Sequence, residues 1–256
     1  TTNFTYSWNK NEIRELAANA VNPVTGEALN LTKLDIKGLG KAKYILKEGG
    51  TLGDLYTTSN LRFNDNGYVE VDKNGNLLMT DEGEDIYLGS VFPNHNLAWR
   101  NDFSYKGINL GVLFTARLGG VCYSATQANL DLYGVSEASA AARDAGGVLI
   151  NGREMVDAQK WYQAIGSQSG LPQYYLYSAT NVRLQELSLG YTFPRKWFRN
   201  KLGLTVSFVG RNLWMIYCKA PFDPEAVAST GLNYQGIDYF MMPSMRNLGF
   251  NVQFQF

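Results

Sequence analysis

The sequence predicts an all-β protein whose long antiparallel strands form part of a transmembrane β-barrel, and three observations lead to this prediction. The last eleven residues, RNLGFNVQFQF, alternate strictly between apolar and polar side chains, which indicates a strand with one oily and one wet face. Several of the other segments that alternate in this way run for about 9–14 residues, longer than the usual strand of about 5–6 in soluble proteins. Short and long connections also alternate along the later strands, as in outer-membrane barrels.

The closing strand carries the clearest signal. Its apolar residues alternate with amides and glycine rather than with lysine and glutamate; they are Leu248, Phe250, Val252, Phe254 and Phe256. This pattern suits a wall with lipid on one side and a hydrated lumen on the other. The chain ends on an aromatic residue, and Phe256, Phe254 and Val252 resemble the signal by which the outer-membrane insertion machinery reads a barrel strand.

Six further segments alternate in the same way, which gives about seven strands. Their apolar positions are, in order, Phe4 to Trp8, a weaker run from about Thr51 to Phe63 in which Leu55 and Tyr56 break the alternation, Leu97 to Tyr105, Ile108 to Leu118, Leu187 to Phe193, and Leu202 to Phe208. Seven strands cannot close a barrel of the plugged-transporter class, which has about 22. We therefore expect residues 1–256 to be the C-terminal part of a larger barrel, with its two open edges paired to further strands.

The connections are of two kinds. Lys106-Gly107 is a two-residue hairpin turn, and Pro194 to Lys201 is a short connection, whereas residues 64–94, 121–180 and 214–243 are long. Strand parity places these three long loops on one outer face. It places the long segment from Glu12 to Gly50 on the opposite side, which breaks the rule.

Composition excludes several other classes of protein. With 23 basic and 23 acidic residues, the chain has no charge imbalance that favours nucleic acid or an anionic surface. No stretch approaches the roughly 18 apolar residues of a spanning helix, and mean hydropathy is −0.23. Cys122 and Cys218 are too few for a disulfide scaffold, and whether they pair stays open. The chain begins at Thr1, so we expect a processed or truncated product.

Several motifs, taken in order, resemble one family. They are NKNEI (9–13), LGSVFPNHNLAWRNDFSYKGINLGVLFTARLGG (88–120), LQELSLGYTFPRKWF (184–198), LTVSFVGRNLW (204–214), APFDPE (220–225) and GIDYFMMPSMRNLGFNVQFQF (236–256). Together they cover about half the chain and are similar to the end of SusC-like TonB-dependent transporters of the Bacteroidetes outer membrane. Two positions differ from the family pattern: SVFP (90–93) replaces its glycine-proline strand entry, and Met242-Pro243 replaces its closing tyrosine-proline.

The resemblance implies a role in the active import of glycans or peptides across the outer membrane. Its implied partners are a SusD-like surface lipoprotein, the remaining strands of the same barrel, outer-membrane lipid, and TonB acting through a plug domain. The plug, the TonB box and the first two-thirds of the barrel are not in these 256 residues. The sequence does not indicate which substrate is carried.

Neither a catalytic constellation nor a cofactor or metal site is expected, so the chain is not predicted to be an enzyme. The single histidine, His95, is interpreted as packing at a strand entrance. Asp72 begins a segment that has partial calcium-loop spacing, but Gly83 stands where a bidentate glutamate belongs, which favours an Asx turn. The carboxylates Glu82, Glu84 and Asp85 are interpreted as solvated charge.

Aromatic residues in the longest loop are the candidates for contact with a substrate or a partner; they are Trp161, Tyr162, Tyr174, Tyr175 and Tyr177. Flat aromatic faces stack on sugar rings and are also favoured at protein interfaces, and some of these residues could instead form the interfacial girdle of the barrel. SEASAAARDA (136–145) predicts a short helix capped by Ser136.

Two alternatives to the main interpretation remain at this stage. A TonB-dependent receptor for a small metal chelate shares the barrel, although the DPE loop and the strand motifs argue against it. A soluble carbohydrate-binding β-sandwich belongs to a different class and predicts strands of about 6 residues with charged outer faces.

The terminal aromatic provides a first test. We expect Phe256→Asp, made in the full-length protein, to lower the amount of folded barrel in the outer membrane, because the substitution damages assembly rather than transport. The measurement is heat-modifiable protein in outer-membrane fractions. Unchanged levels would contradict an insertion role for this residue.

Overall fold

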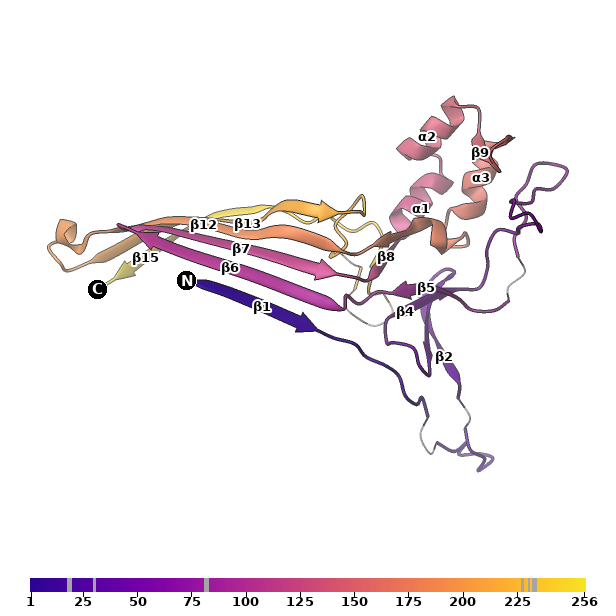
Figure 1. The fold of residues 1–256 in the computed structure, drawn as a ribbon, viewed down its shortest axis with the longest axis horizontal. Coiled ribbons are helices and arrows are strands. Elements are labelled where there is room, and N and C mark those ends of the chain that lie inside the picture. The colour runs from indigo at the N-terminus through magenta and orange to yellow at the C-terminus, as the bar shows by residue number, and fades with distance from the viewer. Residues whose placement is uncertain (18–19, 30, 81–82, 227, 230, 232–233) are drawn as a thin grey trace.

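The structure is a computed structural model that describes residues 1–17, 20–29, 31–80, 83–226, 228–229, 231 and 234–256. It has two parts, a long sheet and a compact lobe at one end of that sheet (Figure 1). We call the lobe end of the sheet the outer end and the opposite end the inner end.

The sheet has six antiparallel strands in the order β1-β6-β7-β12-β13-β15. Their bounds are β1 (Thr2–Trp8), β6 (His95–Tyr105), β7 (Ile108–Leu118), β12 (Asn181–Phe193), β13 (Gly203–Cys218) and β15 (Asn247–Gln255). β6, β7, β12 and β13 have 11 to 16 residues, the length expected of strands that cross a bilayer with a tilt.

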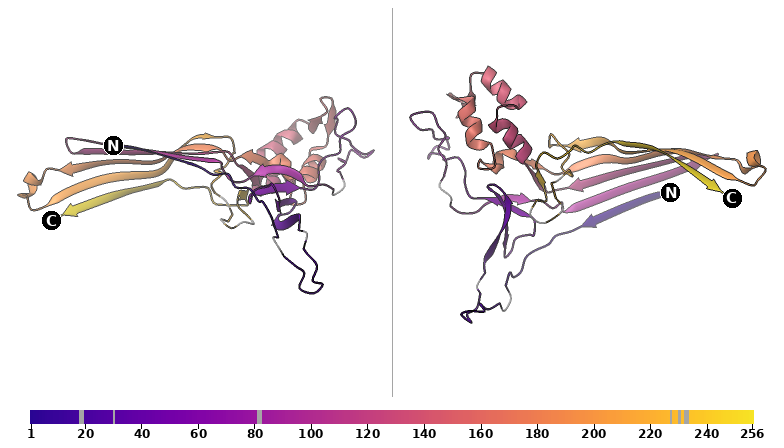
Figure 2. Two further views of the ribbon diagram at one scale, coloured as in Figure 1. Left: turned by 60° about the horizontal axis from the view of Figure 1, so that its bottom comes forward. Right: turned by 180° about the vertical axis from the view of Figure 1, so that it is seen from behind.

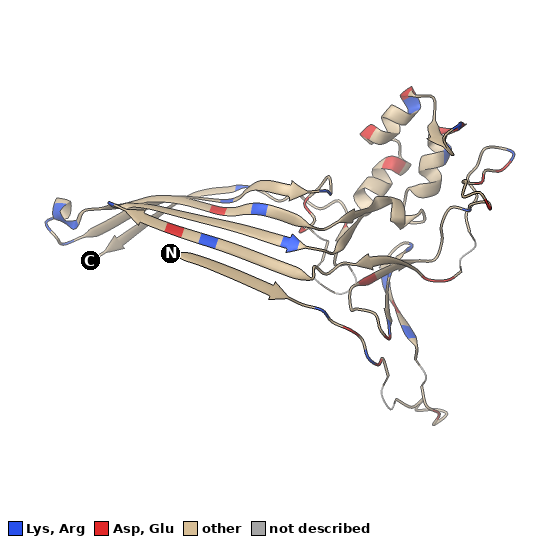
Figure 3. Cartoon of the chain, viewed as in Figure 1, with Lys and Arg blue, Asp and Glu red and all other residues tan. Residues whose placement is uncertain are grey.

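Every charged residue within these six strands lies on one face of the sheet. The strand register aligns Arg100 with Leu113 and Glu186 with Arg211, whereas Phe103, Leu110, Leu189, Phe208 and Phe250 align across the other face. Figure 3 shows the charges as a few bands near the middle and the ends of the strands. The predicted fold class, an all-β antiparallel wall with a polar and an apolar face, is confirmed.

The closing strand has the predicted orientation. Phe250, Val252 and Phe254 are 81%, 49% and 56% exposed, and they pair with Phe208, Val206 and Leu204 of β13 on the apolar face. Asn251 and Gln253 alternate with them and pair with Ser207 and Thr205 on the polar face.

Two tight connections join strands at the inner end. Lys106 and Gly107 both have positive φ, at 48° and 90°, which is the conformation of the hairpin turn that matches strand twist. The connection between β12 and β13 contains one short 3₁₀ helix, η2 (Arg195–Phe198). Both predicted short turns are thus confirmed.

The predicted strand from Thr51 to Phe63 is wrong. Only β4 (Asp54–Thr57) is a strand there, and it belongs to a separate four-stranded sheet in the lobe. Leu55 and Tyr56, which break the alternation, are both buried because β4 is covered on both faces. β1 pairs directly with β6, so the segment from Glu12 to Gly50 lies in one connection at the outer end, and the apparent exception to the loop rule disappears.

The lobe contains the remaining elements. They are β2 (Lys33–Leu39), β3 (Ala42–Lys47), β4, β5 (Ile86–Ser90), β8 (Val121–Ser124), α1 (Ala125–Leu132), α2 (Glu137–Asp144), β9 (Val148–Ile150), β10 (Glu154–Val156), α3 (Ala158–Ile165), η1 (Pro172–Tyr175), β11 (Leu176–Ser178) and β14 (Ile237–Asp238). The helix expected at 136–145 is confirmed as α2, with Ser136 accepting a hydrogen bond from the Ser139 amide at 3.0 Å.

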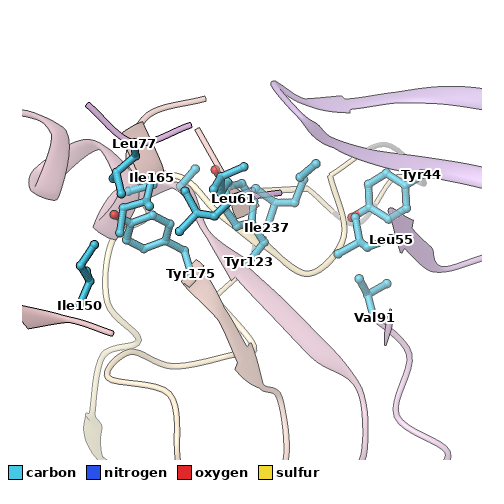
Figure 4. Packing of buried hydrophobic residues seen from close by; sticks show 14 of the residues in the cluster. Tyr44, Leu55, Leu61, Leu77, Val91, Tyr123, Ile150, Ile165, Tyr175 and Ile237 are labelled. Carbon is cyan, nitrogen blue, oxygen red and sulfur yellow. The ribbon is translucent and has the colours of Figure 1, made fainter. Parts of the chain in front are cut away.

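The hydrophobic core of the chain lies in the lobe and not in the sheet. Tyr44, Tyr123, Ile165 and Ile237 are each at most 4% exposed and pack in one cluster (Figure 4). They come from three different connections between the long strands. The outer connections therefore fold together as one body instead of standing as separate loops.

The long sheet is a single open layer. β1 and β15 are its edges, and the views in Figure 2 show no second layer along its length. A β-sandwich is therefore excluded, and the open-sheet form of the prediction is confirmed. In lipid, the unpaired backbone groups of both edges need further strands, so the pairing of each edge with neighbouring barrel strands stays a prediction.

Adjacent residues of β15 allow a matched test of the two faces. In the full-length protein, Phe250→Arg is expected to destabilise the barrel by about 2–4 kcal/mol, because a charge on the lipid face must enter hydrocarbon. Asn251→Arg, one residue away on the polar face, is the control and is expected to have little effect. Folding titrations of both variants into lipid vesicles measure the difference, and equal destabilisation would contradict the assignment of faces.

Candidate functional site

A network of four charges crosses the middle of the polar face. Glu186 of β12 accepts from Arg211 of β13 at 2.9 Å and from Arg100 of β6 at 3.4 Å, and Arg100 also pairs with Asp102 at 3.0 Å. Arg100 and Glu186 lie in register on either side of Leu113 of β7, so the Arg100 side chain spans the intervening strand. Gly111 leaves room beside this network, because a Cβ there would lie 2.5 Å from the Ser188 hydroxyl and 3.0 Å from the Asp102 carboxylate. The charges are balanced within the network, which gives this face a polar but neutral middle.

A second charge cluster fixes the outer end of the wall to the lobe. Arg183 of β12 is only 4% exposed, and its guanidinium donates two hydrogen bonds to Asp223, at 2.8 and 3.1 Å. Glu225 lies 3.2 Å from the same group. This fork-to-fork geometry is the strongest form of arginine–carboxylate pairing. We call Arg183, Asp223 and Glu225 the rim clamp.

Asn212 supports the clamp from β13. Its backbone is left-handed, with φ of 52°, at an irregularity in the pairing of β12 with β13. Its side chain accepts a hydrogen bond from Arg183 at 3.4 Å and donates to the Met245 carbonyl at 3.3 Å. Two motifs that are separate in the sequence, GRNL (210–213) and DPE (223–225), therefore meet on one arginine.

The clamp holds the Asp223 carboxylate ionised. Burial alone would raise the pKa of Asp223, but hydrogen bonds from Arg183 and Ser244, together with the Arg183 charge, outweigh burial and lower it. A carboxyl with a lowered pKa stabilises the folded state at neutral pH, and this contribution is lost as the pH falls through the lowered pKa.

Two neighbouring cavities lie at the outer rim of the polar face, and Glu225 of the clamp lines the first of them. One has a volume of about 310 Å³ and the other about 390 Å³, and they share Phe92, Pro93 and Arg117. Amide side chains line their walls, including Asn96 and Asn181. An arginine, several amides and an aromatic ring can together bind hydroxyl, carbonyl or amide groups, which are common to sugars and peptides.

The aromatic candidates of the longest loop gather in the lobe, where most of them pack. Tyr175 is 3% exposed and is a core residue; Trp161 and Tyr162 of α3 pack against that core. Tyr177 packs edge-on against Phe222 at 5.6 Å. Tyr174 meets Trp161 edge-on at 6.0 Å and is 38% exposed, so its ring has the most free surface among these five.

The other residues singled out in the sequence, where the structure describes them, make local hydrogen bonds or ion pairs. Asp72 accepts from the Asn74 and Asn76 amides at 2.7 and 2.8 Å, which is the expected Asx turn, and these bonds lower its pKa. His95 contacts the Tyr6 hydroxyl through Nδ1 at 2.9 Å. Asp85 accepts from Lys33 at the surface, and Glu82 lies outside the described residues.

The two cysteines are free thiols. Cys122 donates to the Tyr177 carbonyl and Cys218 to the Ala220 carbonyl. Burial raises the pKa of Cys122 to about 12, so this thiol stays protonated and unreactive at neutral pH.

Arg183 is the residue that sequence reasoning missed. It stands just before the recognised LQELSLGY segment, and a lone arginine in a strand carries no pattern of its own. The signal available was a cation at a strand position whose neighbour along the chain, Val182, belongs to the lipid-facing set. Such a cation faces the lumen and needs an anion there, and the DPE motif supplies two.

Within the part of the chain that the structure describes, no helix is both long enough and apolar enough to span a membrane. The described residues also contain no group of three or more histidine, cysteine, aspartate or glutamate side chains placed to hold a metal ion.

An open antiparallel sheet with one apolar and one polar face is the arrangement of a transmembrane β-barrel wall, and comparison with known proteins agrees with this fold. No family model matches the sequence. The chain is similar to the TonB-dependent receptor P3 of Formosa agariphila, with 24% identity over an alignment of 283 residues in length. The alignment covers 99% of this chain and 26% of that receptor.

Solved structures show the same fold. A structure of the RagAB peptide transporter matches with a TM-score of 0.55 and 20% identity, and the RagAB peptide importer in an open-open state matches with 0.54 and 17%. Each match covers 99% of this chain and 26% of the other, so the chain spans about a quarter of the length of the relatives it matches. The resemblance to SusC-like TonB-dependent transporters is confirmed.

Breaking the rim clamp provides a direct test. In the full-length protein, Arg183→Ala is expected to destabilise the outer end by about 3–5 kcal/mol, because it leaves the Asp223 charge buried without its partner. Limited proteolysis of the connection after β13 measures the loss of order. Arg211→Ala is the control, since the Arg211 side chain is 64% exposed and its ion pair contributes little. The same cleavage pattern in both variants would contradict the clamp.

The lowered pKa of Asp223 gives the clamp a pH signature. We expect protease protection of the same connection to persist at pH 4, near the ordinary carboxyl pKa of 3.8, and to be lost only as the pH falls further. In Asp223→Asn, which cannot ionise, protection should be weak at every pH. Loss of protection already at pH 5 in the unmodified protein would contradict this assignment.

Proposed function

We propose that the chain forms the C-terminal part of the barrel wall of a SusC-like TonB-dependent transporter in the outer membrane. The observation that carries this proposal is the sheet itself: a single open layer whose charges all face one side and whose other side is apolar and exposed. A face of this kind is stable against lipid, and the opposite face suits a hydrated lumen.

The transported substrate is a glycan or a peptide, imported together with a SusD-like surface lipoprotein. Three features of the chain support this role. They are the lobe at the outer end, which has its own hydrophobic core, the two amide-lined cavities at the rim, and the partly exposed side chain of Tyr174. The structural neighbour RagAB is described as a peptide transporter, which favours testing peptides beside sugars. Energy would come from TonB through a plug that lies outside these 256 residues.

Tyr174 allows a specific test of contact with the substrate or with the SusD-like lipoprotein. In cells that carry the full-length transporter, Tyr174→Ala is expected to lower import of labelled oligopeptides or oligosaccharides about tenfold, the effect of losing roughly 1.4 kcal/mol from an aromatic contact. Tyr68→Ala is the control, because Tyr68 is 39% exposed but already lies under the Arg153 guanidinium. Import of both substrate classes at the unmodified rate would contradict a contact role for Tyr174.

The proposed location is tested separately. The full-length protein should fractionate with the outer membrane, require detergent for solubility and migrate as a heat-modifiable band. Recovery as a detergent-free soluble protein would contradict the proposed function itself, whatever Tyr174 does.

A further inference from the structure

The inner end of the sheet carries a concentration of positive charge that the transport role does not use. It consists of five exposed cations: Lys106, Arg195, Lys196, Arg199 and Lys201. The two turns that hold them are adjacent, because the Thr192 amide donates to the Gly107 carbonyl at 2.7 Å. Figure 3 shows the larger of these turns as the blue tip of the sheet, at the opposite end from the lobe. We call these five residues the inner cationic belt.

No carboxylate side chain neutralises this belt. None of its members takes part in an ion pair among the described residues. The sequence contains no aspartate or glutamate at 103–130, 187–222 or 239–256, which are the segments that form and flank the inner end. The whole chain has equal numbers of acidic and basic residues, so five uncompensated cations in one place are a local excess that attracts anions.

Aromatic rings next to the belt fix the level of the sheet at which these cations sit. Trp197 is 67% exposed and packs on Phe193 at 5.8 Å, and Phe193 meets Tyr191 edge-on at 5.0 Å. Tyr191 and Phe193 belong to the apolar face, and Tyr105 on the same face is 69% exposed. Tryptophan and tyrosine gather where hydrocarbon gives way to headgroups, so cations directly beyond these rings lie at phosphate depth.

We propose that the inner cationic belt binds the headgroup phosphates of anionic phospholipids in the inner leaflet of the outer membrane. The inference rests on the proposed function, because it needs the apolar face to be in lipid. Continuity of the belt with that face favours a lipid over an acidic polymer of the periplasm. Lysine and arginine donate charge-assisted hydrogen bonds to phosphate oxygens, and the flexible exposed side chains can follow several headgroups at once.

The test uses the full-length transporter, purified from outer membranes and exchanged into a neutral detergent. Native mass spectrometry with added phosphatidylglycerol or phosphatidylcholine counts bound lipids. The unmodified protein is expected to retain phosphatidylglycerol in preference to phosphatidylcholine, and to lose that preference as NaCl rises from about 0.05 to 0.5 M, because salt screens exposed charges. Equal retention of both lipids at low salt would overturn the proposal.

A triple variant, Lys196→Gln with Arg199→Gln and Lys201→Gln, tests the belt directly. Its affinity for phosphatidylglycerol should fall about tenfold or more. The matched control is Arg14→Gln with Lys37→Gln and Lys73→Gln, which removes three exposed cations from the lobe and should leave lipid binding unchanged. Heat modifiability confirms that each variant is folded, and Arg199→Lys, which keeps the charge, should bind like the unmodified protein.

The outcomes separate the two proposals. A heat-modifiable outer-membrane protein whose triple variant still selects phosphatidylglycerol overturns the belt and leaves the transporter role standing. A triple variant that keeps its lipids but loses binding to isolated peptidoglycan also overturns the lipid assignment, in favour of the polymer. An unmodified protein that is soluble without detergent overturns the proposed function and the belt with it.

Discussion

The separation of charge between the two faces of one sheet is the constraint on which the rest of the structure depends. The six strands of the sheet form backbone hydrogen bonds only with their neighbouring strands, and no second layer covers either face of the sheet. In water, exposed side chains such as Phe250 and Trp99 would drive this layer to aggregate. In lipid the same side chains need no cover, and the charged residues must then occupy the other face. The sheet therefore has no core of its own, and the residues that do form a core are all in the lobe.

The lobe and the sheet meet at the rim clamp, where one buried arginine joins three parts of the chain. Arg183 comes from β12, Asp223 from the connection after β13, and Asn212 from β13 itself. Burial makes this pairing costly to break from either side, since each single loss leaves a charge without its partner. The left-handed backbone at Asn212 explains why an asparagine stands there, because asparagine tolerates that conformation better than most residues. The clamp thus gives a physical meaning to two motifs that the sequence offered only as a resemblance.

Patterns in the local sequence predicted most of the strands of the long sheet, one hairpin turn and the start of one helix. Alternation identified β1, β6, β7 and β15 nearly in full, but only the inner halves of β12 and β13, which extend beyond the predicted 187–193 and 202–208. The Lys106-Gly107 turn followed from its spacing, and Ser136 marked the start of α2. What failed was decided by long-range packing. The segment around Leu55 and Tyr56 looked like a poor membrane strand because it is a fully covered strand of the lobe. Tyr175 looked like an exposed loop aromatic and is a core residue. Arg183 had only a weak local signal, a cation beside Val182, because its partners Asn212 and Asp223 lie 29 and 40 residues further along the chain.

The shared core restricts how the outer surface can rearrange. Tyr44, Tyr123 and Ile237 belong to three different connections, the Tyr44 hydroxyl donates to the Gln235 carbonyl, and β14 pairs with β8. No single connection can move without unpacking the other two, and the loss of even one large buried side chain from a core costs about 2–5 kcal/mol. A rearrangement that exposes the rim cavities therefore has two routes. It carries the lobe as one body, or it first opens the clamp at Arg183, where β12 is bound to the connection after β13.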